Sequence, residues 1–337
     1  MDPLTRYLPT LEKAMQQVVA IPTHKPHQLY TMLHYHLGWM NADCQVVHIN
    51  AGRRLRPIFL LLACEAQGGA WEHALPAAVA IELIHNFSLI HDDIEDCDTV
   101  RRGRATLWTL WGEAQAINAG DALFALAYQA ISGLDTAHLP PTRILRTVRR
   151  FTDGILRLTE GQCIDIAFEH QDFVTEAAYL QMIAGKTATL LALSCELGGI
   201  VAGAPQAAIT ALREFGHALG MAFQMEDDLL GLWGDPRRTG KPVGSDLRKA
   251  KKSLPILHGI RHSPKLAALL KQPSTLDDAG VETALHLMEA AGSKTYTQNQ
   301  AQQYHQQALA ALTRTQGHGE AHQALYNLAQ KLLNREK

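Results

Sequence analysis

The sequence predicts an all-α fold, built as one large helical bundle. Three observations favour this class. Apolar residues recur at helical spacing in several long stretches. No stretch shows the β-rich pattern of strands, and no internal repeat or long linker divides the 337 residues. We therefore expect one domain over residues 1–337, with the informative motifs in about residues 50–260.

The bulk composition describes an ordinary soluble globular chain. Hydrophobic residues make up 47% and the formal net charge is −2, so no basic excess indicates a nucleic-acid partner. The five cysteines are scattered without a CxxC pair, which predicts neither a disulfide framework nor a zinc site and favours the cytoplasm. No apolar run approaches the roughly 18 residues of a transmembrane segment, and the first residues lack a signal-peptide pattern.

The first elements are helical pieces in residues 1–49, interrupted at Pro22 and Pro26, with one helix over 29–40. The stretch AGRRLRP at 51–57 then places three arginines at the start of an apolar helix. A helix N-terminus favours anions, and guanidinium groups bind phosphate oxygens in a bidentate way. These arginines, Arg53, Arg54 and Arg56, predict a diphosphate clamp, with a basic surface cluster as the alternative.

The most informative stretch is 82–108, where Pro76 marks a preceding helix start. His85, Ser88, Asp92 and Asp96 share one helix face there. A row of carboxylates needs a counter-charge, and hard oxygen ligands suit Mg²⁺, which usually bridges carboxylates to substrate phosphates. A solvated acidic helix end is the alternative.

A second acidic pair lies in residues 223–235. Gln224, Asp227, Asp228 and Gly231 are spaced i, i+3, i+4 and i+7. Two helices that each end in Asp-Asp could face one cavity, which is how helical bundles build metal sites in their cores.

The remaining elements also have helical patterns. They are a small-residue helix at 111–131, a loop at Pro140-Pro141, and a long amphipathic helix at about 142–166. An apolar helix at 179–200 carries Lys186, and a lysine in that setting needs an anionic partner. A Gly-rich basic loop spans 239–255, and helical segments follow, ending in an amphipathic helix at 318–337.

Together these stretches resemble the trans-isoprenyl diphosphate synthase (polyprenyl synthetase) family. The first aspartate-rich motif is complete, from Asp92 to Asp96; the second ends in Gly231, where the family often has a third aspartate. AGRRLRP resembles the family's Gly-Gly-Lys-Arg-x-Arg-Pro motif, with Ala51 and Arg53 as departures. The resemblance implies a helical bundle around a central active-site cavity.

The resemblance also assigns roles to individual residues. The metal-binding residues it implies are Asp92, Asp93, Asp96, Asp227 and Asp228, for about three Mg²⁺ per active site. The residues that it implies for binding the allylic diphosphate are Arg101, Lys186, Thr187, Gln224 and Lys241, and the loop cation that it implies is Lys251. The residues that it implies for binding isopentenyl diphosphate are Arg53, Arg56, His85 and Arg102. Those that it implies for the pocket that limits chain length are Phe87 and Ser88.

The implied activity is a Mg²⁺-dependent prenyl transfer that condenses isopentenyl diphosphate with an allylic diphosphate. A bulky Phe87 beside the small Ser88 favours C20 geranylgeranyl diphosphate, with C15 farnesyl diphosphate as the alternative. Two rival classes are a terpene cyclase on the same fold, which would not need a second diphosphate site, and a non-catalytic partner subunit. The resemblance also implies a homodimer.

Several positions are left open by the sequence. Asp235 is a candidate to replace the carboxylate that Gly231 lacks, directly or through water. Gln162 and Asp165 match the family's Gly-Gln-x-x-Asp, either as a core polar pair or as support for the pocket. We expect a structural role for Asp121.

Overall fold

The structure is a computed structural model that describes residues 3–21, 28–47, 49, 52–137, 139–235, 243–249, 251–271 and 276–333. Its described residues are overwhelmingly helical, so the predicted all-α class is confirmed. The chain divides into two compact units. Unit 1 comprises Met1–Thr152, Ser194–Ile209 and Gly317–Leu325, and unit 2 comprises Asp153–Leu193, Thr210–Gln316 and Tyr326–Lys337. The expectation of one domain stays a prediction.

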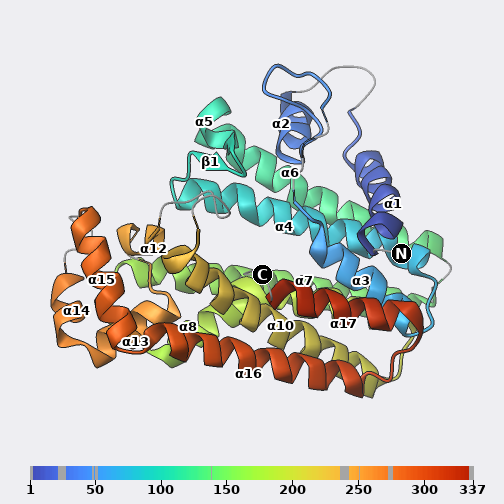
Figure 1. Cartoon of the computed structure of the whole chain (residues 1–337). Coiled ribbons are helices and arrows are strands. Elements are labelled where there is room, and N and C mark those ends of the chain that lie inside the picture. The colour runs from blue at the N-terminus through green and yellow to red at the C-terminus, as the bar shows by residue number, and fades with distance from the viewer. Residues whose placement is uncertain are drawn as a thin grey trace. The chain divides into compact units, whose positions relative to one another are not determined.

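Unit 1 is organised around α4, which packs against α6 and α3 (Figure 1). Pro76 lies in the first turn of α4, where its missing N–H costs no helical hydrogen bond. Most side chains of α3 and of the first half of α4 are buried, which explains why this stretch is apolar on every side. The helices of this unit are α1 (Pro3–Val18), α2 (Gln28–His36), α3 (Leu55–Ala66), η1 (Trp71–Ala74), α4 (Leu75–Glu95), α5 (Leu107–Trp111), α6 (Glu113–Ser132), η2 (Gly133–Ala137) and the first part of α7 (Pro141–Glu169).

One segment of unit 1 corrects an expectation about apolar runs. Within the described residues, Trp71–Glu95 is long and apolar enough to cross a membrane by length and composition. In the structure, 61% of that window is buried, as in the core helix of a globular protein. We assign α4 to the core of unit 1 on this burial.

The first basic loop after α4 is a short hairpin, which the sequence did not predict. Strand β1 (Val100–Arg101) pairs antiparallel with β2 (Arg104–Ala105). Arg102 and Gly103 have φ values of 53° and 73°, and two consecutive positive φ angles define the tight turn that joins twisted strands. Two-residue strands are too short to show an alternating pattern in the sequence.

Arg104 fastens this hairpin to α2. Its guanidinium carbon lies 3.8 Å from the centre of the Tyr35 ring, and it donates to the carbonyl oxygens of Tyr35 and Met40, each at 2.8 Å. Helix α2 ends at His36, four residues before the predicted end. Gly38 has a φ of 84°, the left-handed conformation that commonly terminates helices, and Met40 then forms a bridge with Val46.

Unit 2 contains most of the remaining helices and two apolar clusters. One cluster gathers Tyr179, Met225 and Leu254, and the other gathers Leu232, Leu247 and Val281. The predicted helices at 142–166 and 318–337 are present as α7 and α17, with residues 334–337 outside the described part. The elements are α8 (Glu176–Ile183), η3, a π-helix (Ala184–Ala188), α9 (Thr189–Ala202), α10 (Gln206–Trp233), α12 (Ser245–Arg248), α13 (Leu254–His262), α14 (Pro264–Leu269), α15 (Asp278–Ala290), α16 (Ser293–Arg314) and α17 (Gly319–Leu333); α7, α9, α10 and α17 contribute residues to both units.

Candidate active site

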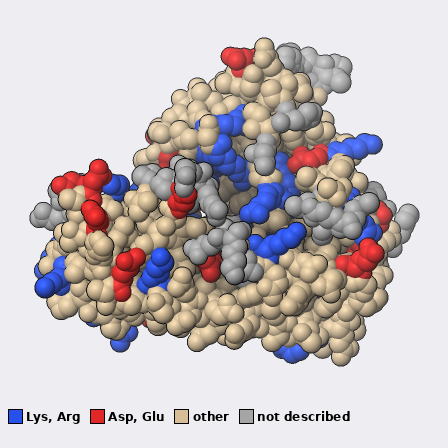
Figure 2. All heavy atoms as spheres, viewed as in Figure 1, with Lys and Arg blue, Asp and Glu red and all other residues tan. Residues whose placement is uncertain are grey.

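The hairpin of unit 1 carries Arg101, Arg102 and Arg104, and basic side chains gather in this region of the surface (Figure 2). The three arginines at the start of α3 differ in their exposure to solvent. Arg53 is exposed and Arg56 is partly exposed, whereas Arg54 is only 4% exposed. The backbone explains the difference: Arg54 adopts a left-handed conformation with φ 49° and ψ 39° at the N-cap of α3. A non-glycine residue in this region costs about 1–2 kcal/mol, so other contacts must hold it there.

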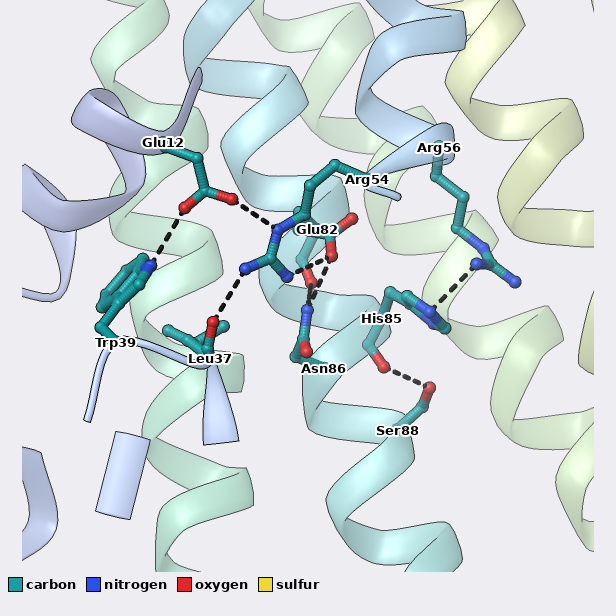
Figure 3. A network of polar contacts seen from close by, with 9 residues as sticks. All are labelled: Glu12, Leu37, Trp39, Arg54, Arg56, Glu82, His85, Asn86 and Ser88. Carbon is teal, nitrogen blue, oxygen red and sulfur yellow. Dashed lines mark hydrogen bonds and ion pairs between the residues drawn. The ribbon is translucent and has the colours of Figure 1, made fainter. Parts of the chain in front are cut away.

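A buried network supplies those contacts (Figure 3). The Arg54 guanidinium lies 2.9 Å from carboxylate oxygens of both Glu12 and Glu82, and it donates to the Leu37 carbonyl at 3.0 Å. Trp39 donates to the second oxygen of Glu12 at 3.0 Å. Burial alone would lower the pKa of Arg54, but the two carboxylates raise it above its ordinary value. The expectation that all three guanidiniums bind a diphosphate is therefore wrong for Arg54, because its side chain is buried and paired with two carboxylates.

Arg56, His85 and Arg102 form a second group in this region, apart from the Arg54 network. Arg56 Nη1 lies 3.0 Å from His85 Nε2 (Figure 3). Burial and then the charges of Arg56 and Arg102 lower the pKa of His85 well below its ordinary value. The ring is therefore neutral, and its Nε2 accepts a hydrogen bond from Arg56. Burial also lowers the pKa of Arg102 to about 10, and neighbouring arginines add to this effect. An anion bound here would relieve that repulsion.

Gly52 makes room for Arg102. Its φ is +119°, and a Cβ placed on it would lie 2.8 Å from Arg102 Nη2. A side chain at position 52 would therefore both strain the backbone and displace the guanidinium. The preceding residue, Ala51, lies outside the described part of the chain.

In the first acidic motif the carboxylates separate into two groups. Asp92 and Asp96 are partly exposed at the end of α4, one turn apart. Asp93 is 2% exposed, and its Oδ1 lies 2.6 Å from Arg101 Nε. Burial raises the pKa of Asp93 to about 6, against the opposing effect of Arg101. The structure thus pairs Arg101, expected on the allylic diphosphate, with the middle aspartate of the motif.

The hairpin helps to line a small cavity of about 30 Å³, whose polar lining residues include Asp93, Arg101, Arg102 and His36. His36 Nε2 is buried and has no hydrogen-bond partner within the described residues. Burial and then the nearby arginines lower the pKa of His36 to about 3. The cavity has room for a water molecule, and its walls supply polar partners. Nothing in the sequence singles out His36 among seventeen histidines.

The two residues expected in the chain-length pocket lie on α4. Phe87 is partly buried and packs edge-on against His91 at 4.8 Å and Phe124 of α6 at 5.3 Å between ring centres. Ser88 donates to the carbonyl oxygen of His85 at 2.9 Å. Phe87 therefore belongs to an aromatic row that links α4 to α6. Asp121, also on α6, has a side chain that is 67% exposed and an Oδ1 that lies 3.9 Å from His91 Nε2 of α4, and the structural role expected for it stays a prediction.

The second acidic motif, in unit 2, shows the same division. Asp227 is partly exposed, whereas Asp228 is 5% exposed. Asp228 accepts hydrogen bonds from the Tyr179 hydroxyl, from Gln224 Nε2 at 3.0 Å and from the Leu254 backbone N–H at 3.1 Å. Burial raises the pKa of Asp228 to about 7, although these donors oppose the rise.

Lys186 and Thr187 lie in the π-helical turn between α8 and α9, a geometry that is rare and often marks functional sites. Lys186 Nζ contacts Asp165 Oδ2 at 2.5 Å, which supplies the expected anionic partner and gives Asp165 a role. Thr187 donates to Gln224 Oε1 at 2.7 Å. The turn packs directly on the backbone of α7, since a Cβ placed on Gly161 would lie 2.1 Å from the backbone nitrogen of Lys186.

The remaining site predictions fall near the loop after α10. Lys241 lies outside the described residues. Lys251 is exposed, and its backbone N–H donates to the Asp246 carbonyl at 2.9 Å. Asp235 is partly exposed and follows the end of α10 at Trp233. Sequence reasoning missed the residues that hold these groups in place. Glu12 and Glu82 hold Arg54, Arg104 holds the hairpin, and Tyr179 holds Asp228.

The donor set fits divalent metal ions of the magnesium type. Among the described residues, no group of three or more His, Cys, Asp or Glu side chains could hold a metal alone. Mg²⁺ is usually held by one or two carboxylates together with substrate phosphates and waters, so it needs no such group. Asp92 and Asp96 offer carboxylates one turn apart on an accessible helix end, and Asp227 offers another in unit 2.

Comparison with known proteins agrees with this chemistry. The family model for polyprenyl synthetase matches residues 38–289. A geranylgeranyl diphosphate synthase of Mycobacterium tuberculosis is 43% identical over 288 residues, covering 84% of this chain and 81% of its own. A (2E,6E)-farnesyl diphosphate synthase of Mycobacterium bovis is 40% identical over 296 residues, with 86% and 81% coverage. The crystal structure of a polyprenyl synthetase from Streptomyces coelicolor superposes with a TM-score of 0.87 at 35% identity, covering 98% of this chain and 97% of that one.

Proposed function

Since the chain belongs to the polyprenyl synthetase family, we propose that its main product is C20 geranylgeranyl diphosphate. The chain is a prenyltransferase that condenses isopentenyl diphosphate with an allylic diphosphate. The observation that favours elongation over cyclisation is the group formed by Arg56, His85 and Arg102, because a cyclase does not need this second diphosphate site. The intact first acidic motif argues against a non-catalytic partner subunit.

We assign the allylic diphosphate to the carboxylate and cation sites of both motifs. Asp92, Asp96 and Asp227 are the carboxylates that would hold divalent metal ions, three Mg²⁺ per site in our proposal. When bound, such ions neutralise the charge that develops on the departing diphosphate. Lys186, with Thr187 and Gln224 beside it, contributes a fixed cation from the π-helical turn. Lys241 and Lys251 complete the proposed set.

The buried aspartates have a supporting role in this proposal. Asp93 orients Arg101 through an ion pair at 2.6 Å, which restrains the guanidinium while the Arg101 side chain remains 27% exposed. Asp228 orients Gln224, whose other end accepts from Thr187. Each support reduces the entropy lost when a ligand binds.

Isopentenyl diphosphate is assigned to Arg53, Arg56, His85 and Arg102. The neutral His85 ring accepts from Arg56 and so fixes the direction of that guanidinium. Ionisation of the allylic substrate leaves a carbocation, which an apolar helical interior protects from water. The alkene of isopentenyl diphosphate then attacks this carbocation to form the new carbon–carbon bond. In our proposal the released diphosphate takes up the proton that the new cation loses, which gives a chain longer by one isoprene unit.

Product length is assigned to the aromatic row that begins at Phe87. The ring contacts with His91 and Phe124 hold Phe87 in place, so it can limit the space for a growing tail. C15 farnesyl diphosphate is the second candidate product, because a relative with that name is nearly as similar as the geranylgeranyl one. We also propose a cytoplasmic homodimer; a molar mass of one 37.1 kDa chain by light scattering would contradict the dimer.

The test is a product assay with the purified chain, labelled isopentenyl diphosphate, Mg²⁺ and C5, C10 or C15 allylic primers in turn. A C20 ceiling supports the proposal, and a C15 ceiling replaces the product while keeping the reaction. The variant Phe87→Ala should lengthen the products, whereas Leu110→Ala, at an exposed apolar position of α5, should not. No incorporation of label with any primer would overturn the proposed reaction.

A further inference from the structure

The second acidic motif ends in a glycine, and the structure shows what occupies the space beside it. Gly231 lies one helical turn after Asp227 on α10, and residues four apart share a face with their Cβ atoms about 5–6 Å apart. A Cβ placed on Gly231 would lie 2.3 Å from Oδ2 and 2.6 Å from Cγ of Asp246. The Asp246 carboxylate therefore occupies the position that a side chain of residue 231 would take.

Helix α12, which carries Asp246, is fastened to α10 at this point. The Ser245 hydroxyl donates to the Gly231 carbonyl at 3.1 Å, and the Gly244 N–H donates to the Leu232 carbonyl at 3.1 Å. Leu247, which is 1% exposed, packs in one apolar cluster with Leu232. Residues on both sides of Asp246 thus fix where its carboxylate lies, and its placement is a consequence of packing.

Asp235 is a weaker candidate for the same task. Helix α10 ends at Trp233, so helical spacing no longer directs the Asp235 side chain onto the face of Asp227. Asp246 needs no such spacing, because its position beside Gly231 is given directly by the contact.

We propose that Asp246 supplies the carboxylate that Gly231 lacks, so that Asp227 from α10 and Asp246 from α12 together form the metal-binding side of the second motif. Glycine at position 231 is then a requirement of the arrangement, because any side chain there would displace Asp246. The inference rests on the proposed function, which brings divalent metal and a diphosphate to this motif.

The direct test measures metal binding without turnover. Equilibrium dialysis of the full chain against Mn²⁺ and inorganic diphosphate reports the metal held by the protein in excess of the diphosphate-only compartment. Asp246→Asn should weaken Mn²⁺ binding about 10-fold, the scale seen when a carboxylate that supports a metal is removed. The matched control is Asp278→Asn on α15, because its 98% exposed carboxylate pairs at 2.5 Å with Arg248, which lies on α12 as Asp246 does. That control, and Asp235→Asn, should bind Mn²⁺ as the wild type does.

A carboxylate swap separates metal binding from folding. Gly231→Asp alone places a side chain against Asp246 and should lower both the melting temperature and Mn²⁺ binding. Adding Asp246→Ala to it removes the clash and returns a carboxylate from α10. This double variant should bind Mn²⁺ about 10-fold more tightly than Asp246→Ala alone.

The outcomes distinguish this inference from the proposed function. Wild-type protein that binds no Mn²⁺ with diphosphate contradicts the proposed function itself. Wild-type binding that is unchanged in Asp246→Asn, or a double variant no better than Asp246→Ala, overturns the inference and leaves the proposed function standing. A loss that Asp235→Asn shares equally would also overturn the assignment to Asp246.

Discussion

The two acidic motifs divide their neighbouring aspartates in the same way but support them differently. In each Asp-Asp pair the first carboxylate is partly exposed, and the second, Asp93 or Asp228, is at most 5% exposed. One residue of helix turns the side chain by about 100°, which directs the second carboxylate to the interior. Asp93 is held by the charged Arg101, whereas Asp228 is held by the neutral donors Tyr179, Gln224 and the Leu254 N–H. Exposed and buried aspartates should therefore fail in different ways when they are changed.

The largest expected effect is on turnover when an exposed aspartate is lost. Asp92→Asn and Asp227→Asn should each lower kcat at least 100-fold. Removing a residue that only hydrogen-bonds to a metal ligand already lowers metal affinity or activity 10- to 100-fold. Their melting temperatures should stay within about 2 °C of the wild type, since neither side chain is buried. Asp121→Asn and Asp278→Asn are surface controls in units 1 and 2, with exposed fractions of 67% and 98%. Near wild-type turnover of Asp227→Asn would remove the second motif from catalysis.

The next effect is on stability and concerns the charged support of the first motif. Arg101→Ala leaves the buried Asp93 carboxylate without its cation, which should lower the free energy of unfolding by about 3 kcal/mol at pH 8. Adding Asp93→Asn to this variant should recover part of the loss, because the unpaired charge is gone. Urea denaturation of the two variants measures both values. Equal losses in the single and the double variant would show that Asp93 is not charged in the folded protein at this pH.

A smaller stability effect is expected at the second motif, where the support is neutral. Tyr179→Phe removes one of three donors to Asp228 and should cost about 1–2 kcal/mol, as for an ordinary buried hydrogen bond. Tyr296→Phe is the matched control, because its hydroxyl donates to the carboxylate of Glu176, a residue of neither acidic motif. If Tyr179→Phe lowered the free energy of unfolding as much as Arg101→Ala does, the neutral donors around Asp228 would stabilise the protein no less than the charged partner of Asp93.

The sequence predicts those features of the site that depend on residues close together in the chain. The shared face of Asp92 and Asp96, the position of His85 and the need of Lys186 for an anion all depend on local helical spacing, and the structure agrees with them. The exposed and buried members of each aspartate pair also follow from that spacing. The polyprenyl synthetase family was recognised from the same motifs.

The rest depends on contacts between distant segments. Arg53, Arg54 and Arg56 look equivalent in sequence, and only the left-handed backbone at Arg54 sends one of them inward to Glu12 and Glu82. Tyr179 reaches Asp228 across 49 residues. Asp246 reaches Gly231 through packing of α12 and not through any periodicity. Such contacts leave no pattern in a single sequence.

The smallest expected effect is a pH dependence that belongs to the arginine-rich surroundings of the first motif. The pKa of His36 is lowered to about 3 by burial and by Arg102, Arg101, Arg54 and Arg104, whereas an unfolded histidine titrates near 6.5. Between these values the unfolded chain takes up a proton that the folded chain does not. The free energy of unfolding should therefore fall as the pH falls, by about 1 kcal/mol between pH 7 and pH 5.5 from this residue.

The variant His36→Gln isolates this contribution, because an amide does not titrate in that range. Its free energy of unfolding, measured with urea at several pH values, should fall less steeply with acid than that of the wild type. His286→Gln, at a ring on the surface of α15 that is 74% exposed, should keep the wild-type slope. If His36→Gln also keeps the wild-type slope, then the arginines do not hold His36 neutral. The cavity beside it would then contain a counter-ion that compensates their charge, and the contrast between the charged first motif and the neutral second one would be weaker than the contacts indicate.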